Sequence, residues 1–122
     1  PPLGSGEVRV TRDSVLEAHE ALRAAVPLKL ACGSTTRTVQ RPGLSDRTLI
    51  LDDHLVSDRH PEPVRYFRSV DLRALNRIAV GLTGVPEIWD AYNREAPPVD
   101  LQELITALAV ACAAGFLVLD PA

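Results

Sequence analysis

The stretch from Asp100 to Asp120 contains no lysine or arginine. Lysine is nearly absent from the whole chain, since Lys29 is the only one beside twelve arginines. The formal net charge is −3 and the sequence pI is about 5.5. A protein that coats nucleic acid needs a basic surface to neutralise phosphates. We therefore expect no nucleic-acid partner. The scarcity of lysine among many alanines and valines is typical of a GC-rich bacterial genome.

The chain also lacks long apolar runs and a charged-then-apolar leader. We therefore expect no transmembrane helix, no membrane partner and a cytoplasmic protein. Cys32 and Cys112 are too few for a disulfide framework, or for a metal site by themselves. The opening residues PPLGS (1–5) match what remains after an affinity tag is cut off, so we leave them out of the fold.

Features of catalysis are scarce as well. The run GSTTRT (33–38) lacks the glycine-rich loop that cradles phosphates, and no histidine stands beside a serine or cysteine as a base. The run DDHLVSDRH (52–60) holds metal-ligand types, and strand alternation would bring Asp52 and His54 to one side. No third ligand follows from the spacing. We expect no catalytic residue, no metal and no cofactor, and a small enzyme is the least favoured hypothesis.

The first half of the chain is patterned as strands around one helix. Glu7–Val10 alternates like a short strand. The apolar spacing over Asp13–Val26 predicts a helix with Asp13 as its N-cap. Four β-like runs follow, at residues 27–33, 35–40, 48–56 and 63–70. Turn-forming sequences separate them: Gly33-Ser34, Pro42-Gly43 and DRHPEP (58–63).

From Asp71 the apolar period becomes helical. One helix is expected to start there and to break at Gly84, and a second to start at Pro86 and to end before Pro97. The third is opened by Asp100.

The ends of the third helix carry their own signals. Asp100 and Glu103 have the spacing of a capping box, and Gly115 is a natural residue to follow the helix end. FLVLD (116–120) then closes the chain as an extended run. We expect an α+β fold: a small antiparallel sheet followed by a three-helix winged-helix-like unit (34–122), with an extra N-terminal strand–helix element (6–33).

In a winged helix, the third helix enters the major groove of DNA. Between Asp71 and Ala122, however, three arginines face seven carboxylates, a net charge of −4. Asp100 and Glu103 would occupy the N-terminal turn, where a groove-reading helix makes its base contacts, and phosphates would repel them. We expect that this helix does not bind DNA.

A second face of this helix carries small apolar residues, namely Ala107, Val110, Ala113 and Ala114. Left uncovered, they would form a shallow apolar channel along which an extended peptide could lie. The alternative is that this face packs on the N-terminal helix or on a second copy of the chain, because helices apolar on all sides are usually buried.

Three motifs occur in order along the C-terminal part. Leu75-Asn76 lies inside the first helix, Gly84-Val85-Pro86-Glu87-Ile88 opens the second, and Val99-Asp100 with Gly115-Phe116-Leu117-Val118 bounds the third. With this layout, the chain from about Thr48 to Asp120 resembles the PqqD-like fold, the RiPP recognition element. The resemblance implies a non-catalytic module of natural-product biosynthesis. It captures the leader segment of a precursor peptide by β-strand addition and presents the peptide to a modifying enzyme.

In that family the leader adds to an exposed sheet edge and packs against the third helix. The edge we expect here is PVRYFRS (63–69), whose residues alternate between two sides. The expected peptide-binding residues come from this edge and from the third helix: Val64, Arg65, Tyr66, Phe67, Arg68, Glu103, Ala107, Val110 and Ala114. Arginines on an edge also discourage self-pairing, which is the alternative explanation for Arg65 and Arg68.

The partners implied are a precursor peptide and a peptide-modifying enzyme, and a homodimer is a further expectation. The alternative function is a winged-helix transcriptional regulator or a dimerisation domain, with any DNA contact made by the arginine-bearing strands. Binding that resists salt and needs an extended peptide favours the first function, whereas steep salt dependence on duplex DNA favours the second.

Overall fold

The computed structural model describes residues 8–25, 27–45 and 48–119, so that the opening PPLGS and Asp120 lie outside it. The helices within these residues are α1 (Arg12–Ala24), α2 (Leu72–Val80), α3 (Val85–Glu95) and α4 (Leu101–Ala113). The strands are β1 (Leu30–Cys32), β2 (Arg37–Ser45), β3 (Thr48–Val56), β4 (Tyr66–Phe67), β5 (Val70–Asp71) and β6 (Leu117–Leu119). The fold class is α+β, as the sequence predicts. In the described part of the chain, no helix is long and apolar enough to cross a membrane.

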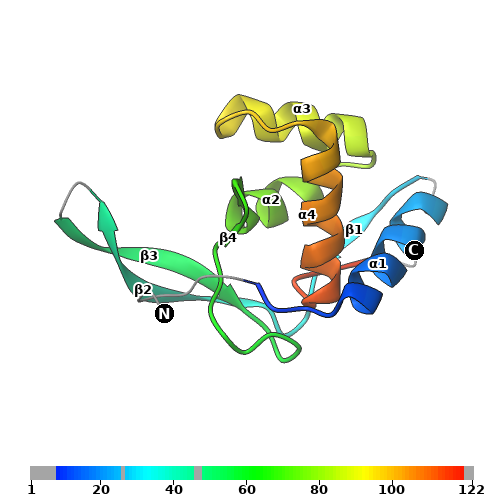
Figure 1. Cartoon of the computed structure of the whole chain (residues 1–122). Helices are drawn as coiled ribbons and strands as arrows, with labels where there is room; N and C mark the ends of the chain where they lie inside the picture. The colour runs from blue at the N-terminus through cyan, green and yellow to red at the C-terminus, as the bar shows by residue number, and fades with distance from the viewer. Residues whose placement is uncertain (1–7, 26, 46–47, 120–122) are drawn as a thin grey trace.

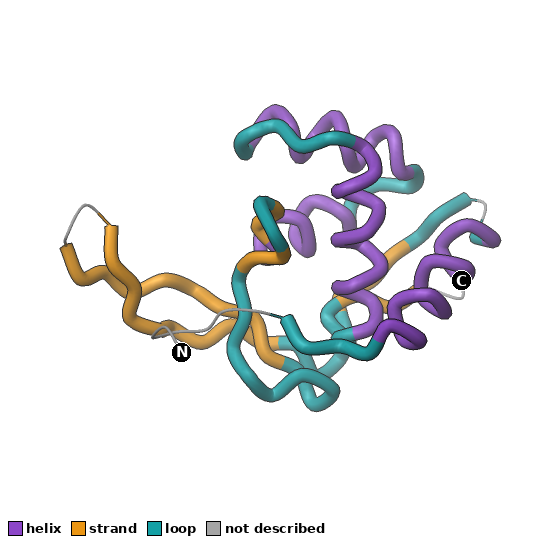
Figure 2. Tube along the Cα trace, viewed as in Figure 1, coloured by secondary structure: helices purple, strands orange, loops and turns teal. Residues whose placement is uncertain are grey.

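The helices gather in one body, from which β2 and β3 project as a hairpin that we call the arm (Figures 1 and 2). α4 lies in the middle of this body and is contacted by α1, α2, α3, β5 and β6. From Ala107 to Ala113 its sequence is apolar on all sides, and such a helical segment needs to be covered. Seven of its thirteen residues are buried: Leu104, Ala107, Leu108, Ala109, Val110, Ala111 and Ala113. The helix without basic residues is therefore the centre of the hydrophobic core.

Side-chain caps mark the first turn of α1, α2 and α4, whereas α3 begins after Gly84 without one. Asp71 and Asp100 cap α2 and α4, and each carboxylate accepts hydrogen bonds from backbone N–H groups of the first turn. The predicted cap of α1 is wrong. Thr11 caps this helix through its Oγ1, which accepts from the backbone N of Ser14 at 3.1 Å. Asp13 instead lies in the first turn, where the positive end of the helix dipole favours a carboxylate.

Gly115 ends α4 as predicted. Its φ is +82°, in the left-handed region that glycine adopts without a steric penalty. The backbone N of Gly115 donates to the carbonyl of Cys112 at 3.1 Å, and that of Phe116 donates to the carbonyl of Ala111 at 2.9 Å. This pair of bonds is a Schellman motif, which satisfies the last carbonyls of the helix and turns the chain into β6.

The N-terminal and C-terminal parts of the chain are joined by pairing and packing. β1 and β6 are antiparallel, with Leu30 opposite Leu119 and Cys32 opposite Leu117. α1 packs along α4, and its Leu22 belongs to the same core cluster as the buried residues of the other helices. The two segments that the sequence analysis separates, 6–33 and 34–122, thus share one hydrophobic core in their described residues.

The predicted strand over Glu7–Val10 is wrong for the residues that the structure describes, Val8–Val10, which are irregular. The backbone N of Arg9 donates to Nε2 of His60 at 2.9 Å and not to a neighbouring strand. The side chains of Val8 and Val10 pack partly against the core. This packing explains why apolar residues alternate at Val8 and Val10 although the segment forms no β-ladder.

The arm continues past the predicted turn at Pro42-Gly43, so that prediction is wrong. β2 and β3 are antiparallel over nine residues each, from Arg37 opposite Val56 to Ser45 opposite Thr48. β2 has no strand neighbour other than β3 among the described residues. Proline is tolerated inside an edge strand, because a donor on the outer side is not needed there.

Candidate functional site

The expected docking edge, residues 63–69, is not a continuous strand. Val64 forms an isolated bridge to Leu55, with N–H···O distances of 2.7 and 3.0 Å in the two directions. The chain then makes the two-residue strands β4 and β5, and it reverses between them at Arg68, whose φ is +54°. The predicted alternation is therefore wrong. Val64 is fully buried, whereas Tyr66, expected on the same side, is 49% exposed.

Side chains of this segment contact one another and the body. The guanidinium of Arg68 lies 5.1 Å from the ring centre of Phe67, and that of Arg65 lies 5.6 Å from the ring centre of Tyr66. Arg65 also forms an ion pair with Asp71 at 3.2 Å, in which both side chains are mostly buried. Arg65 therefore has an internal structural role in this state.

The expected channel on α4 is closed by the chain itself. Ala107 and Ala114 are fully buried, and Val110 is 2% exposed. These residues do not face solvent because elements of the same chain surround α4. Glu103 lies at the edge of this covered region. Its carboxylate accepts from both the backbone N and the hydroxyl of Ser69 and so holds the turn between β4 and β5.

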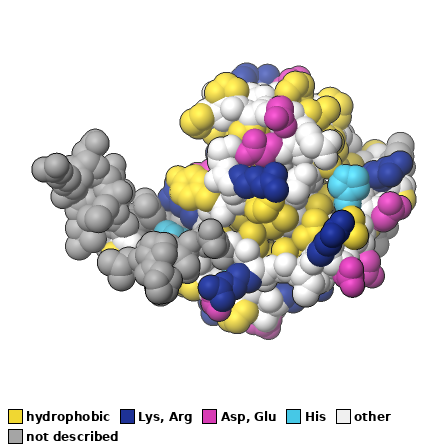
Figure 3. Space-filling model, in the orientation of Figure 1, with side chains coloured by type: hydrophobic (Ala, Val, Ile, Leu, Met, Phe, Trp, Pro, Cys, Tyr) yellow, Lys and Arg dark blue, Asp and Glu magenta, His cyan; other side chains and the backbone are white. Residues whose placement is uncertain are grey.

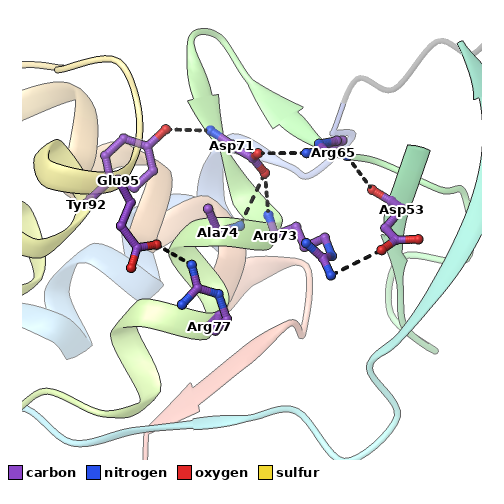
Figure 4. Close-up of polar contacts among 8 residues, drawn as sticks. All are labelled: Asp53, Arg65, Asp71, Arg73, Ala74, Arg77, Tyr92 and Glu95. Atoms are coloured by element: carbon purple, nitrogen blue, oxygen red, sulfur yellow. Dashed lines mark hydrogen bonds and ion pairs between the residues drawn. The ribbon is translucent and has the colours of Figure 1, made fainter. Parts of the chain in front are cut away.

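A polar network joins Arg65 and β5 to the helices α2 and α3 (Figure 4). Asp71 is its centre. One carboxylate oxygen accepts from the backbone N of Arg73 at 3.0 Å and of Ala74 at 3.2 Å, and the other accepts from Arg65. The hydroxyl of Tyr92 accepts from the backbone N of Asp71 at 2.9 Å. Burial raises the pKa of the Tyr92 phenol above its ordinary value, and the nearby Asp71 carboxylate adds to this effect although the hydrogen bond opposes it.

Two further ion pairs connect α2 to its neighbours. Arg73 pairs with Asp53 of β3 at 3.1 Å, and Arg77 pairs with Glu95 of α3 (Figure 4). Arg65 donates to the main-chain carbonyl of Asp53 at 3.5 Å. The edge of β3 that faces away from β2 is thus occupied near the helical body. Val64 pairs with Leu55, and the guanidinium of Arg65 binds the Asp53 carbonyl.

A pocket lies between the base of the arm and α2. Its volume is about 360 Å³, and it is lined by Cys32, Thr36, Arg37, Thr38, Leu55, Arg73, Asn76 and Arg77. Three of the eight lining residues are arginines and none is acidic. We call it the α2 pocket. Thr38 and Leu55 are cross-strand partners in the arm, so the pocket adjoins the base of β2.

Asn76 is the least accessible polar residue of the α2 pocket, at 7% exposure. Its Nδ2 contacts Sγ of Cys32 at 3.8 Å, whereas its Oδ1 has no hydrogen-bond partner in the described structure. Buried polar atoms without a partner are uncommon, and each calls for an explanation. In the sequence, Asn76 stands out only as part of a family motif. The helical spacing could have singled out Asn76 as a buried polar residue, because it lies in the apolar stripe of α2 with Leu72, Leu75 and Ala79.

The other expected ligand types do not converge. In the described part of the chain, no group of three or more His, Cys, Asp or Glu side chains could hold a metal ion. Both ring nitrogens of His60 have structural partners, the backbone N of Arg9 and the carbonyl of Glu62 at 2.8 Å. The side chain of Asp52 lies outside what the structure describes.

No protein-family model, curated protein or solved structure matches this chain. The likeness to the RiPP recognition element rests on its sequence motifs alone.

Proposed function

We propose that this chain is a non-catalytic peptide-binding module that takes up the leader segment of a precursor peptide by strand addition at β2. The observation that supports the proposal best is the outer edge of β2. No backbone hydrogen bond joins its nine residues to any described residue outside β3. A free edge gives a guest strand main-chain hydrogen bonds without requiring a particular side chain.

The stability of the arm also argues for a guest. A two-stranded hairpin is only marginally stable in water unless a third strand or a helix supports it. The arm projects beyond the helical body (Figure 1). A guest strand on β2 would turn the arm into a three-stranded sheet. The arm would therefore gain order when the peptide binds.

β2 is a better docking edge than the one that the sequence suggested. Val64 and Arg65 occupy the outer side of β3, and β4 is only two residues long. Pro42 limits the useful part of β2, because proline cannot donate a main-chain hydrogen bond. The segment Arg37–Arg41 remains, and it begins at the α2 pocket. A guest there would have its other residues free for a modifying enzyme.

The alternative, DNA binding, has less support. α4 has its apolar faces covered and has no basic residue to offer a groove. Arg65, Arg73 and Arg77 already pair with carboxylates. On the face drawn in Figure 3, lysine and arginine side chains are scattered among acidic and apolar ones. Phosphate neutralisation needs a continuous basic surface.

The test is a peptide selected from a displayed library of random octapeptides, with the whole chain as bait. We expect methylation of the peptide's main-chain nitrogens to weaken binding by about tenfold at every second position, because each lost hydrogen bond to a strand edge costs about 1 kcal/mol or more. Fluorescence polarisation of the labelled peptide measures this. Methylation effects without a period of two would contradict strand addition.

Salt dependence separates the alternatives. Peptide affinity is expected to fall by less than about tenfold between about 50 and 200 mM salt, whereas a duplex reader making many phosphate contacts loses about a thousandfold. Self-association that a selected peptide fails to reverse would instead indicate pairing of arms between two copies.

A further inference from the structure

We propose that the α2 pocket binds one acidic residue of the guest peptide. In this arrangement the main-chain N–H of that residue donates to Oδ1 of Asn76, and its carboxylate pairs with Arg37. The inference rests on the proposed function in one respect, namely that the guest is a peptide. It adds what the free edge alone does not supply, a preference for one kind of side chain.

Oδ1 of Asn76 is a hydrogen-bond acceptor without a partner among the described residues. The Asn76 side chain is buried, and its Nδ2 contacts Sγ of Cys32. An unsatisfied buried polar atom destabilises the folded state. The cost disappears when a bound group supplies the missing hydrogen bond. A peptide N–H is such a donor, and a main chain adding to β2 would bring one to the pocket.

The charge of the α2 pocket favours an acidic group, because three arginines and no acidic residue line it. Arg73 and Arg77 are neutralised by Asp53 and Glu95. Arg37 is exposed and forms no ion pair with any residue that the structure describes. Among the described residues, the pocket therefore has one guanidinium without an ion-pair partner and no acidic lining residue. A guanidinium recognises a carboxylate through two parallel hydrogen bonds, which makes a single carboxylate the matching group.

The position and size of the α2 pocket also suit one residue of a guest strand on β2. Thr38 and Leu55 line the α2 pocket and face each other across the arm. A guest strand beside Thr38 would direct every second side chain to the same face of the sheet. The α2 pocket lies between Thr38 and Leu55 of the arm and Arg73, Asn76 and Arg77 of α2. The volume of about 360 Å³ is near the lower end for ligand sites, which suits one residue rather than a large ligand.

The alkylation rate of Cys32 reports whether the α2 pocket is occupied, so the test does not require the natural leader peptide. Cys32 is exposed, lines the pocket and contacts Asn76. A bound ligand would shield it from iodoacetamide. Cys112 is an internal reference, since burial raises the pKa of its thiol to about 11 and it lines a different cavity. Mass spectrometry of the two cysteine peptides gives both alkylation rates in one sample.

The probe is N-acetyl-glutamate N-methylamide, a single acidic residue with a peptide bond on each side. Its matched control is the glutamine compound. We expect the glutamate compound to slow alkylation of Cys32 at about millimolar concentration, as a ligand of this size allows. The glutamine compound should need about tenfold more, because it lacks the charge-assisted bonds. The rate at Cys112 should not change.

Two variants assign the effect to the named residues. Arg37→Gln should remove the difference between the two compounds. Asn76→Leu should remove protection by both. Each variant is compared with itself, with and without probe, because the substitution changes the intrinsic rate at Cys32.

Three results would overturn the proposal: equal protection by the glutamate and glutamine compounds, no protection by either, or equal protection by inorganic phosphate. The single-residue probe cannot form a strand. Failure of the pocket and failure of strand addition are therefore seen separately, the first in this assay and the second in the methylation scan of the selected octapeptide.

Discussion

Asn76 follows Leu75 on the buried side of α2, where every neighbour in the stripe is apolar. Packing alone would favour an apolar side chain at this position, because the amide has an unpartnered atom. The chain contains a second, contrasting asparagine. Asn93 is half-buried, and its Oδ1 accepts from the backbone N of Val99 at 3.0 Å while its Nδ2 donates to the Val99 carbonyl at 3.4 Å. The two residues have the same side chain, but only the amide of Asn93 has both of its ends hydrogen-bonded to the protein.

Asn76→Leu is expected to raise the free energy of unfolding by about 1 kcal/mol, since it removes an unsatisfied buried acceptor. The matched change Asn93→Leu should lower that free energy by about 1–3 kcal/mol, because it leaves the backbone N–H of Val99 without its acceptor, while the Val99 carbonyl keeps its hydrogen bond from Nε1 of Trp89. Urea denaturation followed by circular dichroism measures both. A loss of stability in Asn76→Leu as large as in Asn93→Leu would mean that Asn76 is structural.

At the scale of elements, helix ends explain much of the arrangement. Asp71 caps α2 and also anchors β5 through the network in Figure 4. Asp100 caps α4, accepting from the backbone N of Glu103 at 2.7 Å. The second half of the predicted capping box is replaced, because the Glu103 carboxylate binds Ser69. Gly115 then ends α4 and starts β6.

Gly115→Ala is expected to lower the free energy of unfolding by about 1–2 kcal/mol, because a residue with a Cβ is strained at positive φ. The added Cβ would also lie 3.1 Å from Cδ of Arg59. Gly81→Ala is the matched control at the end of α2, where φ is −93° and the nearest atom is 4.0 Å away. It should be neutral or slightly stabilising. Equal effects of the two changes would contradict this account of the end of α4.

At the scale of the whole molecule, the N-terminal helix and the C-terminal strand complete the body. α1 covers α4, and β1 pairs with β6. We therefore expect α1 to unfold together with the other helices and not as an independent element. Trp89, the only tryptophan, lies in α3 and reports on a part of the body that is separate from α1.

Leu22→Ala is expected to cost about 2–5 kcal/mol, since Leu22 is a core residue of α1 that is 7% exposed. Trp89 fluorescence and circular dichroism should shift together, because the domain unfolds in one transition. Leu16→Ala on the same helix is the control, and it should change stability by less than about 0.5 kcal/mol because Leu16 is 53% exposed. An unchanged Trp89 transition in Leu22→Ala would mean that α1 unfolds separately.

Local signals in the sequence determined the helices of the C-terminal half. Asp71, Pro86, Asp100 and Gly115 mark helix ends through hydrogen bonds, or dihedral preferences, that involve only neighbouring residues. The mostly apolar sequence of α4 was also readable, but it left open whether the helix is covered by its own chain or offers an apolar channel, although helices apolar on all sides are usually buried. The absence of lysine and arginine from α4 is explained by the place of this helix in the hydrophobic core.

Only the tertiary structure decided what covers α4, because burial is a property of contacts between distant segments. α1 and other elements of the same chain cover it, so Ala107, Val110 and Ala114 are not available to a guest. The break of residues 63–69 at Arg68 depends in the same way on Glu103, more than thirty positions away, holding Ser69. The α2 pocket joins β1, β2, β3 and α2, and no local pattern could have brought Arg37 and Asn76 together.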